Sequence, residues 1–324
     1  MSHTVLVQWT RRGAVVGALG VLASLGAAGV AVAQSNIAFS TTRDGVLIGN
    51  AEIYVMRSDG AEETRLTFDT DANLASDVEP TWSPDATRLA WTRIAFSATV
   101  VQPGDIWVMN ADGSGQTPLT SGPHHDTNPS WSPDGTRIAF TRRPASDPGN
   151  ADVYVVNADG TGEQRLTTDP AFDGEPTWSP DGTRIAFATD RDGNAEIYAM
   201  AADGTDETRL TFGDAADDHP AWSPTGRRIA FISDRDGFAQ IYIMPPDHDG
   251  TRRVTSGVEG PGMPAANWAP AWSPRAGYLA YTADTDVGFE IMRIGLRSGE
   301  QTQLTSDPAP DFGPAWSALI DSPE

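Results

Sequence analysis

Short runs in which apolar and polar positions alternate recur along this chain, separated by turns rich in Asp, Gly and Pro. Within residues 176–211, such runs contain Ile185 and Phe187, then Ile197, and finally Leu210. Because successive side chains of a strand point to opposite faces, each run predicts a β-strand, and this copy predicts four antiparallel strands joined by tight turns. A lone sheet of this kind would expose its apolar faces, so several sheets are expected to pack around an axis.

One phrase of ten residues marks the repeats. Trp-Ser-Pro-Asp-Gly-Thr-Arg-Ile-Ala-Phe starts at both Trp131 and Trp178. Related copies start at Trp82, Trp222, Trp272 and Trp316. A period of this length, filled with short strands, predicts a β-propeller. We interpret the repeated Trp, Ile and Phe positions as core residues and the Asp-Gly pairs as turn residues.

The number of blades follows from the tryptophans. Five of them start a complete repeat, whereas residues 36–67 supply three strands with no Trp-Ser-Pro before them. The missing strand matches residues 314–317 near the C-terminus. We therefore predict an all-β, six-bladed propeller over residues 34–317, whose first blade is completed by the C-terminal strand, followed by a short tail at 318–324.

The N-terminal segment predicts export. Arg11 and Arg12 precede a long uncharged stretch of Ala, Gly, Val and Leu that ends in Ala31-Val32-Ala33. This pattern is typical of a signal peptide, so we predict cleavage after residue 33 by the Sec or the twin-arginine route and a periplasmic or secreted protein. A retained membrane anchor is the alternative, and no membrane insertion is expected after cleavage.

Composition narrows the classes of partner. The chain has no cysteine, which excludes disulfides and thiolate chemistry. Its formal net charge of −22 disfavours nucleic acid and anionic lipid as partners, and favours a basic protein surface or metal cations. The simpler interpretation is that the acidity serves only solubility.

The repeat also carries a family resemblance. Residues 176–211 match P-x-W-S-P-D-G-x-R-I-A-F, D-G-N-x-E-I-Y-x-M and R-L-T, and they resemble the TolB-type propeller family, relatives of WD-repeat domains. The resemblance implies binding at the channel mouth, where TolB of the Tol–Pal system binds the peptidoglycan-associated lipoprotein. TolB has an α/β domain before its propeller, which this chain is expected to lack. Related peptidases carry a hydrolase domain, but this sequence contains no G-x-S-x-G motif.

Polar segments just before the innermost strands are the candidate binding site. We expect them to surround the axis and form an acidic mouth. The predicted partner-binding residues are Asp77, Glu79, Asp126, Asn128, Asp173, Glu175, Asp217, His219, Asn267, Trp268 and Asp311. For the aspartates, the alternative is that each caps its own turn. The Glu, Asn and His positions vary in type, which a turn role would not require, so they favour binding.

Metal sites are the remaining alternative. Residues 190–193 and 234–237 are oxygen-rich loops, but neither has the full ligand series of an EF-hand. His124 and His125 lack the helical spacing of a zinc peptidase, although His125 and His219 are candidates to converge at the mouth. We therefore predict no catalytic residue, no metal ligand and no cofactor, with structural calcium as an alternative.

These observations lead to one functional hypothesis. The chain is expected to be an exported, monomeric, non-enzymatic protein that binds a protein or a peptidoglycan-associated component of the cell envelope through the acidic mouth. The alternatives are a metal-assisted carbohydrate-active hydrolase or lyase and a calcium-stabilised structural propeller.

Overall fold

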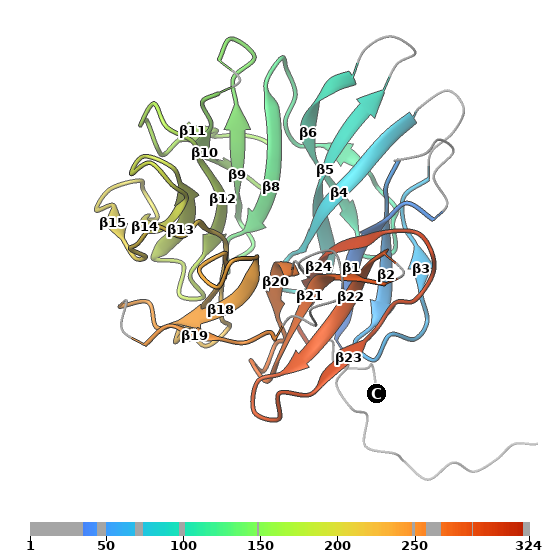
Figure 1. Cartoon of the computed structure of the whole chain (residues 1–324). Helices are drawn as coiled ribbons and strands as arrows, with labels where there is room; N and C mark the ends of the chain where they lie inside the picture. The colour runs from blue at the N-terminus through green and yellow to red at the C-terminus, as the bar shows by residue number, and fades with distance from the viewer. Residues whose placement is uncertain are drawn as a thin grey trace, which may run out of the picture.

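The computed structural model describes residues 35–43, 50–68, 74–96, 101–147, 149–247, 250–256, 267–286 and 288–319. These residues form six four-stranded antiparallel sheets arranged around a central axis (Figure 1). The predicted all-β, six-bladed architecture is confirmed. The predicted signal peptide and residues 320–324 of the predicted tail lie outside the described residues.

Each blade is one sheet that runs from an innermost strand at the axis to a short outermost strand. In that order, blade 1 has β24 (Asp311–Trp316), β1 (Asn36–Thr41), β2 (Glu52–Arg57) and β3 (Thr64–Arg65). Blade 2 has β4 (Leu74–Trp82), β5 (Arg88–Phe96), β6 (Val101–Asn110) and β7 (Thr117–Pro118). Blade 3 has β8 (His125–Trp131), β9 (Arg137–Arg143), β10 (Asp152–Asn157) and β11 (Gln164–Arg165). Blade 4 has β12 (Asp173–Trp178), β13 (Arg184–Thr189), β14 (Glu196–Ala201) and β15 (Thr208–Arg209). Blade 5 has β16 (Asp217–Trp222), β17 (Ile229–Ser233), β18 (Gln240–Met244) and β19 (Arg252–Arg253). Blade 6 has β20 (Asn267–Trp272), β21 (Tyr278–Thr285), β22 (Gly288–Gly295) and β23 (Gln301–Gln303).

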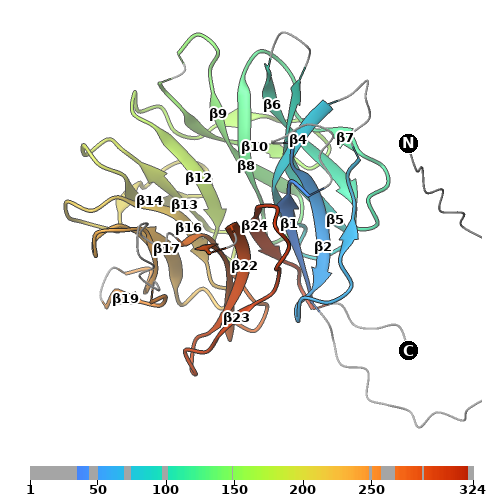
Figure 2. The ribbon, with the colours of Figure 1, turned by 45° about the vertical axis from the view of Figure 1, so that its right-hand side comes forward.

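The C-terminal strand closes the ring, as predicted. β24 pairs antiparallel with β1 in a register that sets Trp316 opposite Ile37, and the two strands lie side by side in Figure 2. The junction is tied further by bonds from the Ser317 amide to the Asn36 carbonyl (2.8 Å) and from the Trp316 indole to the Ser35 hydroxyl (2.9 Å). The first and last parts of the described chain therefore share one sheet, and this sheet joins the two ends of the ring.

The core is divided into six apolar clusters, and each cluster joins two successive blades. Trp178, Ile185 and Phe187 face blade 3, whereas Ile197 and Leu210 face blade 5, and all five are at most 5 % exposed. The repeated apolar residues are therefore inter-blade core, as expected.

A threonine at the end of each repeat fastens the outer strand. Its hydroxyl accepts a hydrogen bond of 2.8–3.0 Å from a backbone N–H of the third strand. The six residues are Thr67, Thr120, Thr167, Thr211, Thr255 and Thr305. The fourth strands span only two or three residues, so these bonds supply attachment that their short ladders lack.

The innermost strands begin earlier than expected. The polar segments that we placed before these strands lie within them, as in β12, which starts at Asp173. Each innermost strand contains a β-bulge, for example between Gly174 and Thr177, so pairing resumes after an irregular residue. A bulge bends a strand without ending it. The alternating sequence pattern is broken at the bulge, so it did not indicate that the strand extends to the polar segment before it.

Candidate functional site

The six innermost strands line a channel along the propeller axis. The channel encloses about 380 Å³, and a ring of six prolines forms part of its wall. These prolines are Pro80, Pro129, Pro176, Pro220, Pro270 and Pro314. Proline has no N–H to leave unsatisfied, so it suits a strand edge that faces an open channel.

The residue before each of these prolines has a left-handed backbone. The six positions are Glu79, Asn128, Glu175, His219, Ala269 and Gly313, with φ between 50° and 62°. For a residue other than Gly, this conformation costs roughly 1 kcal/mol. All six residues line the channel. Blades 2 to 5 thus place four polar side chains at the mouth, whereas blades 6 and 1 place a methyl group and a hydrogen there.

Hydrogen bonds between blades hold these strained positions. A Glu79 carboxylate oxygen accepts from the Asn128 amide (2.8 Å), and a Glu175 oxygen accepts from the His219 amide (2.7 Å). At two other positions a hydroxyl takes this role: Thr141 accepts from the Glu175 amide at 2.8 Å, and Thr282 accepts from the Gly313 amide at 3.0 Å. Glu79 and Glu175 therefore have a structural duty besides any binding role.

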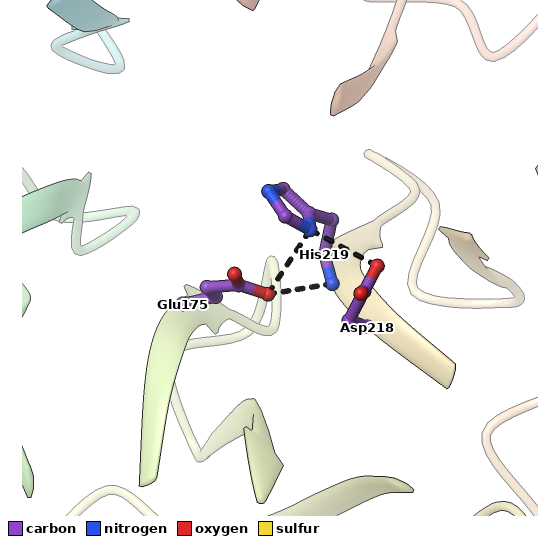
Figure 3. Close-up of side chains that lie close together, drawn as sticks. All are labelled: Glu175, Asp218 and His219. Carbon is purple, nitrogen blue, oxygen red and sulfur yellow. Dashed lines mark hydrogen bonds and ion pairs between the residues drawn. The ribbon is translucent and has the colours of Figure 1, made fainter. Parts of the chain in front are cut away.

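His219 lies between two carboxylates at the boundary of blades 4 and 5 (Figure 3). Its Nδ1 is 3.0 Å from an Asp218 oxygen and 3.2 Å from a Glu175 oxygen. Burial in the mouth opposes protonation, but the Glu175 and Asp218 charges outweigh it and raise the pKa of His219 to about 9. Burial also raises the pKa of Glu175. The arrangement is a compact group of three ligand-type side chains.

The aspartates two residues earlier do not open onto the mouth. Asp77, Asp126, Asp173, Asp217 and Asp311 are at most 1 % exposed. Each pairs, at 2.7–3.3 Å, with an arginine that lies in the second strand of the same blade or in the loop after that strand. In the same order, the partners are Arg93, Arg142, Arg191, Arg235 and Arg43. These five aspartates are therefore not exposed at the described mouth, and ion pairs with arginine, rather than the alternative turn-capping role, account for their carboxylates.

Asp77 has the longest of these ion pairs. Arg93 lies 3.3 Å from one carboxylate oxygen of Asp77, and the Trp91 indole donates to the other at 2.8 Å. Burial raises the pKa of Asp77 to about 7 against the opposing effects of Arg93 and Trp91, and the Glu52 carboxylate of blade 1 adds to the rise. Asp77 therefore exchanges its proton near neutral pH.

This shift predicts a pH dependence of stability. The pKa of Asp77 is raised above its usual 3.8, so its stabilising contribution is complete below that value and is lost as the pH rises through about 7. Between about pH 5 and pH 8, we expect the free energy of unfolding to fall by about 2 kcal/mol more in the wild type than in Asp77→Asn. Asn occurs naturally at the equivalent position, Asn267. Urea unfolding of both proteins at the two pH values measures this, and identical falls would contradict it.

Blade 6 departs from the pattern at the mouth. Asn267 stands where the other blades have Asp, and its backbone pairs with Ala283. No arginine occurs in the second strand of this blade or in the loop after it, so blade 6 lacks both the aspartate and the arginine of the ion pair found in the other blades. Trp268 packs edge-on against Phe289 with ring centroids 4.9 Å apart and is partly exposed. Trp268 thus packs within blade 6 and, unlike its neighbour Ala269, is not among the residues that line the channel.

The loops considered for calcium use their carboxylates elsewhere. Asp190 accepts from the Phe172 amide at 2.8 Å, and Asp192 accepts from the Tyr198 hydroxyl at 2.7 Å. The second loop repeats this arrangement, with Asp234 bound to the Ala216 amide and Asp236 bound to the Tyr242 hydroxyl. Their oxygens are divided among protein donors, which disfavours a common calcium ion.

The two histidines considered as candidates to converge, His125 and His219, have different partners. His125 Nδ1 accepts from the Gly104 amide at 2.6 Å, and burial lowers its pKa. Potential metal ligands gather in one group among the described residues, and that group contains His219 with Glu175 and Asp218. Asp218 was missed at the sequence level, as were Ala269 and Gly313. A proline follows each left-handed residue, and this repeated proline is the sequence signal that places Ala269 and Gly313 at the positions equivalent to Glu175 and His219.

A second hollow, of about 860 Å³, lies between blades 2 and 3 at the opposite end of the strands. Its carboxylates belong to the turns: Asp85 accepts from Ser83 and Thr87, and Asp134 accepts from Ser132 and Thr136. These bonds lower the pKa values of Asp85 and Asp134, first through Ser83 and Ser132. The carboxylates of this hollow are therefore engaged in stabilising their own turns, so the hollow is less suited to a functional site than the mouth.

Comparison with known proteins supports the repeat assignment. The family model of the TolB beta propeller domain matches residues 144–217 and 192–262. Comparison with the curated proteins gives no match. The part of the chain that the structure describes contains no helix with the length and apolar character needed to cross a bilayer.

Solved structures share the fold at low identity. TolB from Acinetobacter baumannii is 21 % identical with a TM-score of 0.74, and the match covers 88 % of this chain and 67 % of that one. A TolB candidate from Agrobacterium tumefaciens is 22 % identical with a TM-score of 0.60, over 85 % and 89 % of the two chains. A puromycin-hydrolyzing peptidase of Mycobacterium tuberculosis is 16 % identical with a TM-score of 0.57, over 78 % and 41 %. At these identities the likeness concerns the fold, which serves both binding proteins and enzymes.

Proposed function

We propose that this chain, a propeller built from TolB-like repeats, is an exported, non-enzymatic binding protein. Its partner is a protein or a peptidoglycan-associated component of the periplasm or cell surface, held at the channel mouth. The fold supports a protein-binding scaffold in general, because similar propellers include TolB from Acinetobacter baumannii. The monomer is the expected binding unit.

One observation carries the proposal: the polar side chains occupy only an arc of the mouth. Four adjacent blades place Glu79, Asn128, Glu175 and His219 at the left-handed positions, and the other two place Ala269 and Gly313 there. Glu79 and Glu175 also hold the next blade, but the left-handed backbone itself does not require a polar side chain, because Ala269 and Gly313 adopt it too. Asn128 and His219 therefore retain a strained conformation that glycine would relieve, and strain of this kind is typical of functional sites.

The arc also suits a partner chemically. Carboxylate, amide and imidazole groups face a concave, partly apolar channel, and a few convergent polar groups in such a hollow favour specific binding. The mouth carries more acid than base, so a partner segment with Lys, Arg or amide groups fits it best. Trp268 adds an apolar contact on blade 6.

The test removes side chains without disturbing the ring. In Asn128→Gly/His219→Gly, the backbone keeps its bonds to Glu79 and Glu175, and relief of strain offsets the flexibility of glycine. We expect a melting temperature within a few degrees of wild type and a loss of partner affinity of about tenfold or more. Affinity capture from envelope extract, followed by titration of the recovered partner, measures both.

The control is Arg297→Ala, an exposed residue in the β22–β23 turn at the opposite end of blade 6. It should retain full affinity. The proposal fails if the double glycine variant binds as tightly as wild type, or if the control weakens binding equally.

A further inference from the structure

We propose that Glu175, Asp218 and His219 bind a divalent transition metal ion of the zinc class at the boundary of blades 4 and 5. Glu175 comes from β12, and Asp218 and His219 come from β16. Figure 3 shows the imidazole Nδ1 directed at both carboxylates. The site goes beyond partner binding, because it needs only the chain and the ion.

The distances between the ligand atoms fit one small ion. His219 Nδ1 lies 3.0 Å from Asp218 Oδ1 and 3.2 Å from Glu175 Oε2, and all three ligand atoms lie within 4.8 Å of one another. A tetrahedral ion with bonds of about 2.0–2.1 Å has ligands about 3.3 Å apart. The two distances from Nδ1 are therefore close to those of a zinc site, and the third, between the two carboxylate oxygens, is at most 4.8 Å.

The local charge also favours a cation. Each buried aspartate of the neighbouring network has an arginine within 3.3 Å. Glu175 and Asp218 differ, because His219 supplies the ion pair recorded for each of them in the described chain. Glu79 adds a further negative charge to the field at this histidine. Two carboxylates beside one imidazole leave a negative excess, which a divalent ion would neutralise.

The ligand types select the class of ion. Imidazole nitrogen suits Zn²⁺, Co²⁺ and Ni²⁺, whereas Ca²⁺ and Mg²⁺ prefer sites made of oxygen atoms alone. Three protein ligands leave at least one coordination position for water or for a group of a partner. Glu175 and His219 both line the axial channel of about 380 Å³, so that position has room on the channel side.

The scaffold holds two of the ligands in place before the ion binds. The Glu175 carboxylate accepts the His219 amide at 2.7 Å, which ties the two blades together at the site. Thr141 fixes the backbone of Glu175 from blade 3 at 2.8 Å. Ligands held by second contacts in this way lose little freedom when they bind a metal.

The experiment is a metal titration of the purified chain after removal of bound metal by chelator. With Zn²⁺, and with Co²⁺ as a spectroscopic probe, we expect one equivalent per chain and visible Co²⁺ absorption from a site of low symmetry. His219→Gly and Asp218→Asn should each weaken Zn²⁺ binding by about tenfold or more. Arg297→Ala, an exposed residue at the opposite end of blade 6, should bind Zn²⁺ as wild type does.

The same titrations contain the results that would overturn the site. One such result is weak binding of many Zn²⁺ ions per chain that an equal concentration of Ca²⁺ displaces. The other is an unchanged Zn²⁺ affinity in His219→Gly when the melting temperature of this variant matches that of wild type. No partner enters this experiment, so its failure leaves the binding proposal standing, and a failed capture experiment leaves the metal site standing.

Discussion

Deletion of residues 311–324 is expected to abolish cooperative folding of the whole propeller. The deletion removes β24, the innermost strand of blade 1, and with it the pairing to β1 that closes the ring and the packing of β24 against β4 of blade 2. It uncovers Ile37 and Phe39, which are fully buried in the cluster that joins blades 6 and 1. It also leaves Arg43 without the Asp311 carboxylate, 2.9 Å away.

The size of this effect follows from the packing. Loss of a buried tryptophan alone costs roughly 3–5 kcal/mol, and domains of this kind are stable by only about 5–15 kcal/mol. Trp316 is only partly buried, but the deletion removes its whole strand and also uncovers the fully buried Ile37 and Phe39, so it should consume most of the stability. Calorimetry should show no cooperative transition near that of wild type, whereas deletion of residues 320–324 should melt normally. A wild-type transition in the longer deletion would contradict the split blade.

The second large effect is expected from Arg142→Met. Arg142 is only 8 % exposed and donates to both oxygens of Asp126 at 2.7 Å. Its guanidinium also stacks over Phe140 and Tyr154. Met keeps much of the side-chain volume but leaves the Asp126 charge buried without its partner, so we expect a loss of about 3–5 kcal/mol in the free energy of unfolding.

A double variant isolates the ionic part of this loss. In Asp126→Asn/Arg142→Met both charges are absent, as they are in blade 6, where Asn267 occurs without a nearby arginine in the repeat. We expect the double variant to recover more than half of the loss caused by Arg142→Met. Urea unfolding of the wild type, both single variants and the double variant measures the coupling. Additive losses would show that the pair is not coupled.

The architecture could be predicted from the sequence because its signals are local and repeated. The Trp-Ser-Pro-Asp-Gly phrase encodes a strand, a turn and a second strand within ten residues. In the structure Asp181, for example, bonds the Thr183 amide at 3.0 Å and the Ser179 hydroxyl at 2.6 Å within its own turn. Closure was also predictable, because the strand missing at one end of the chain was present at the other.

The accessibility of the candidate site could not be predicted in this way. Asp173 and Glu175 are two residues apart, so a regular strand would place both on one face. The left-handed backbone at Glu175 breaks this alternation: Asp173 is buried against Arg191, whereas Glu175 lines the channel. The arginine partners could not be predicted from a fixed spacing either. They follow the aromatic residue of the second strand by two residues in some blades, as in Phe140–Arg142, and by four in others, as in Phe187–Arg191.

The sequence by itself thus determined the period, the strands, the number of blades and the shared first blade, since each depends on short patterns repeated along the chain. The tertiary structure alone decided which polar residues face the axis, which carboxylates are neutralised by arginine, and that Asp218 joins Glu175 and His219. These outcomes depend on contacts between neighbouring blades and on a bulge that reverses the alternation of side chains. Neither feature produces a regular pattern in the amino-acid sequence.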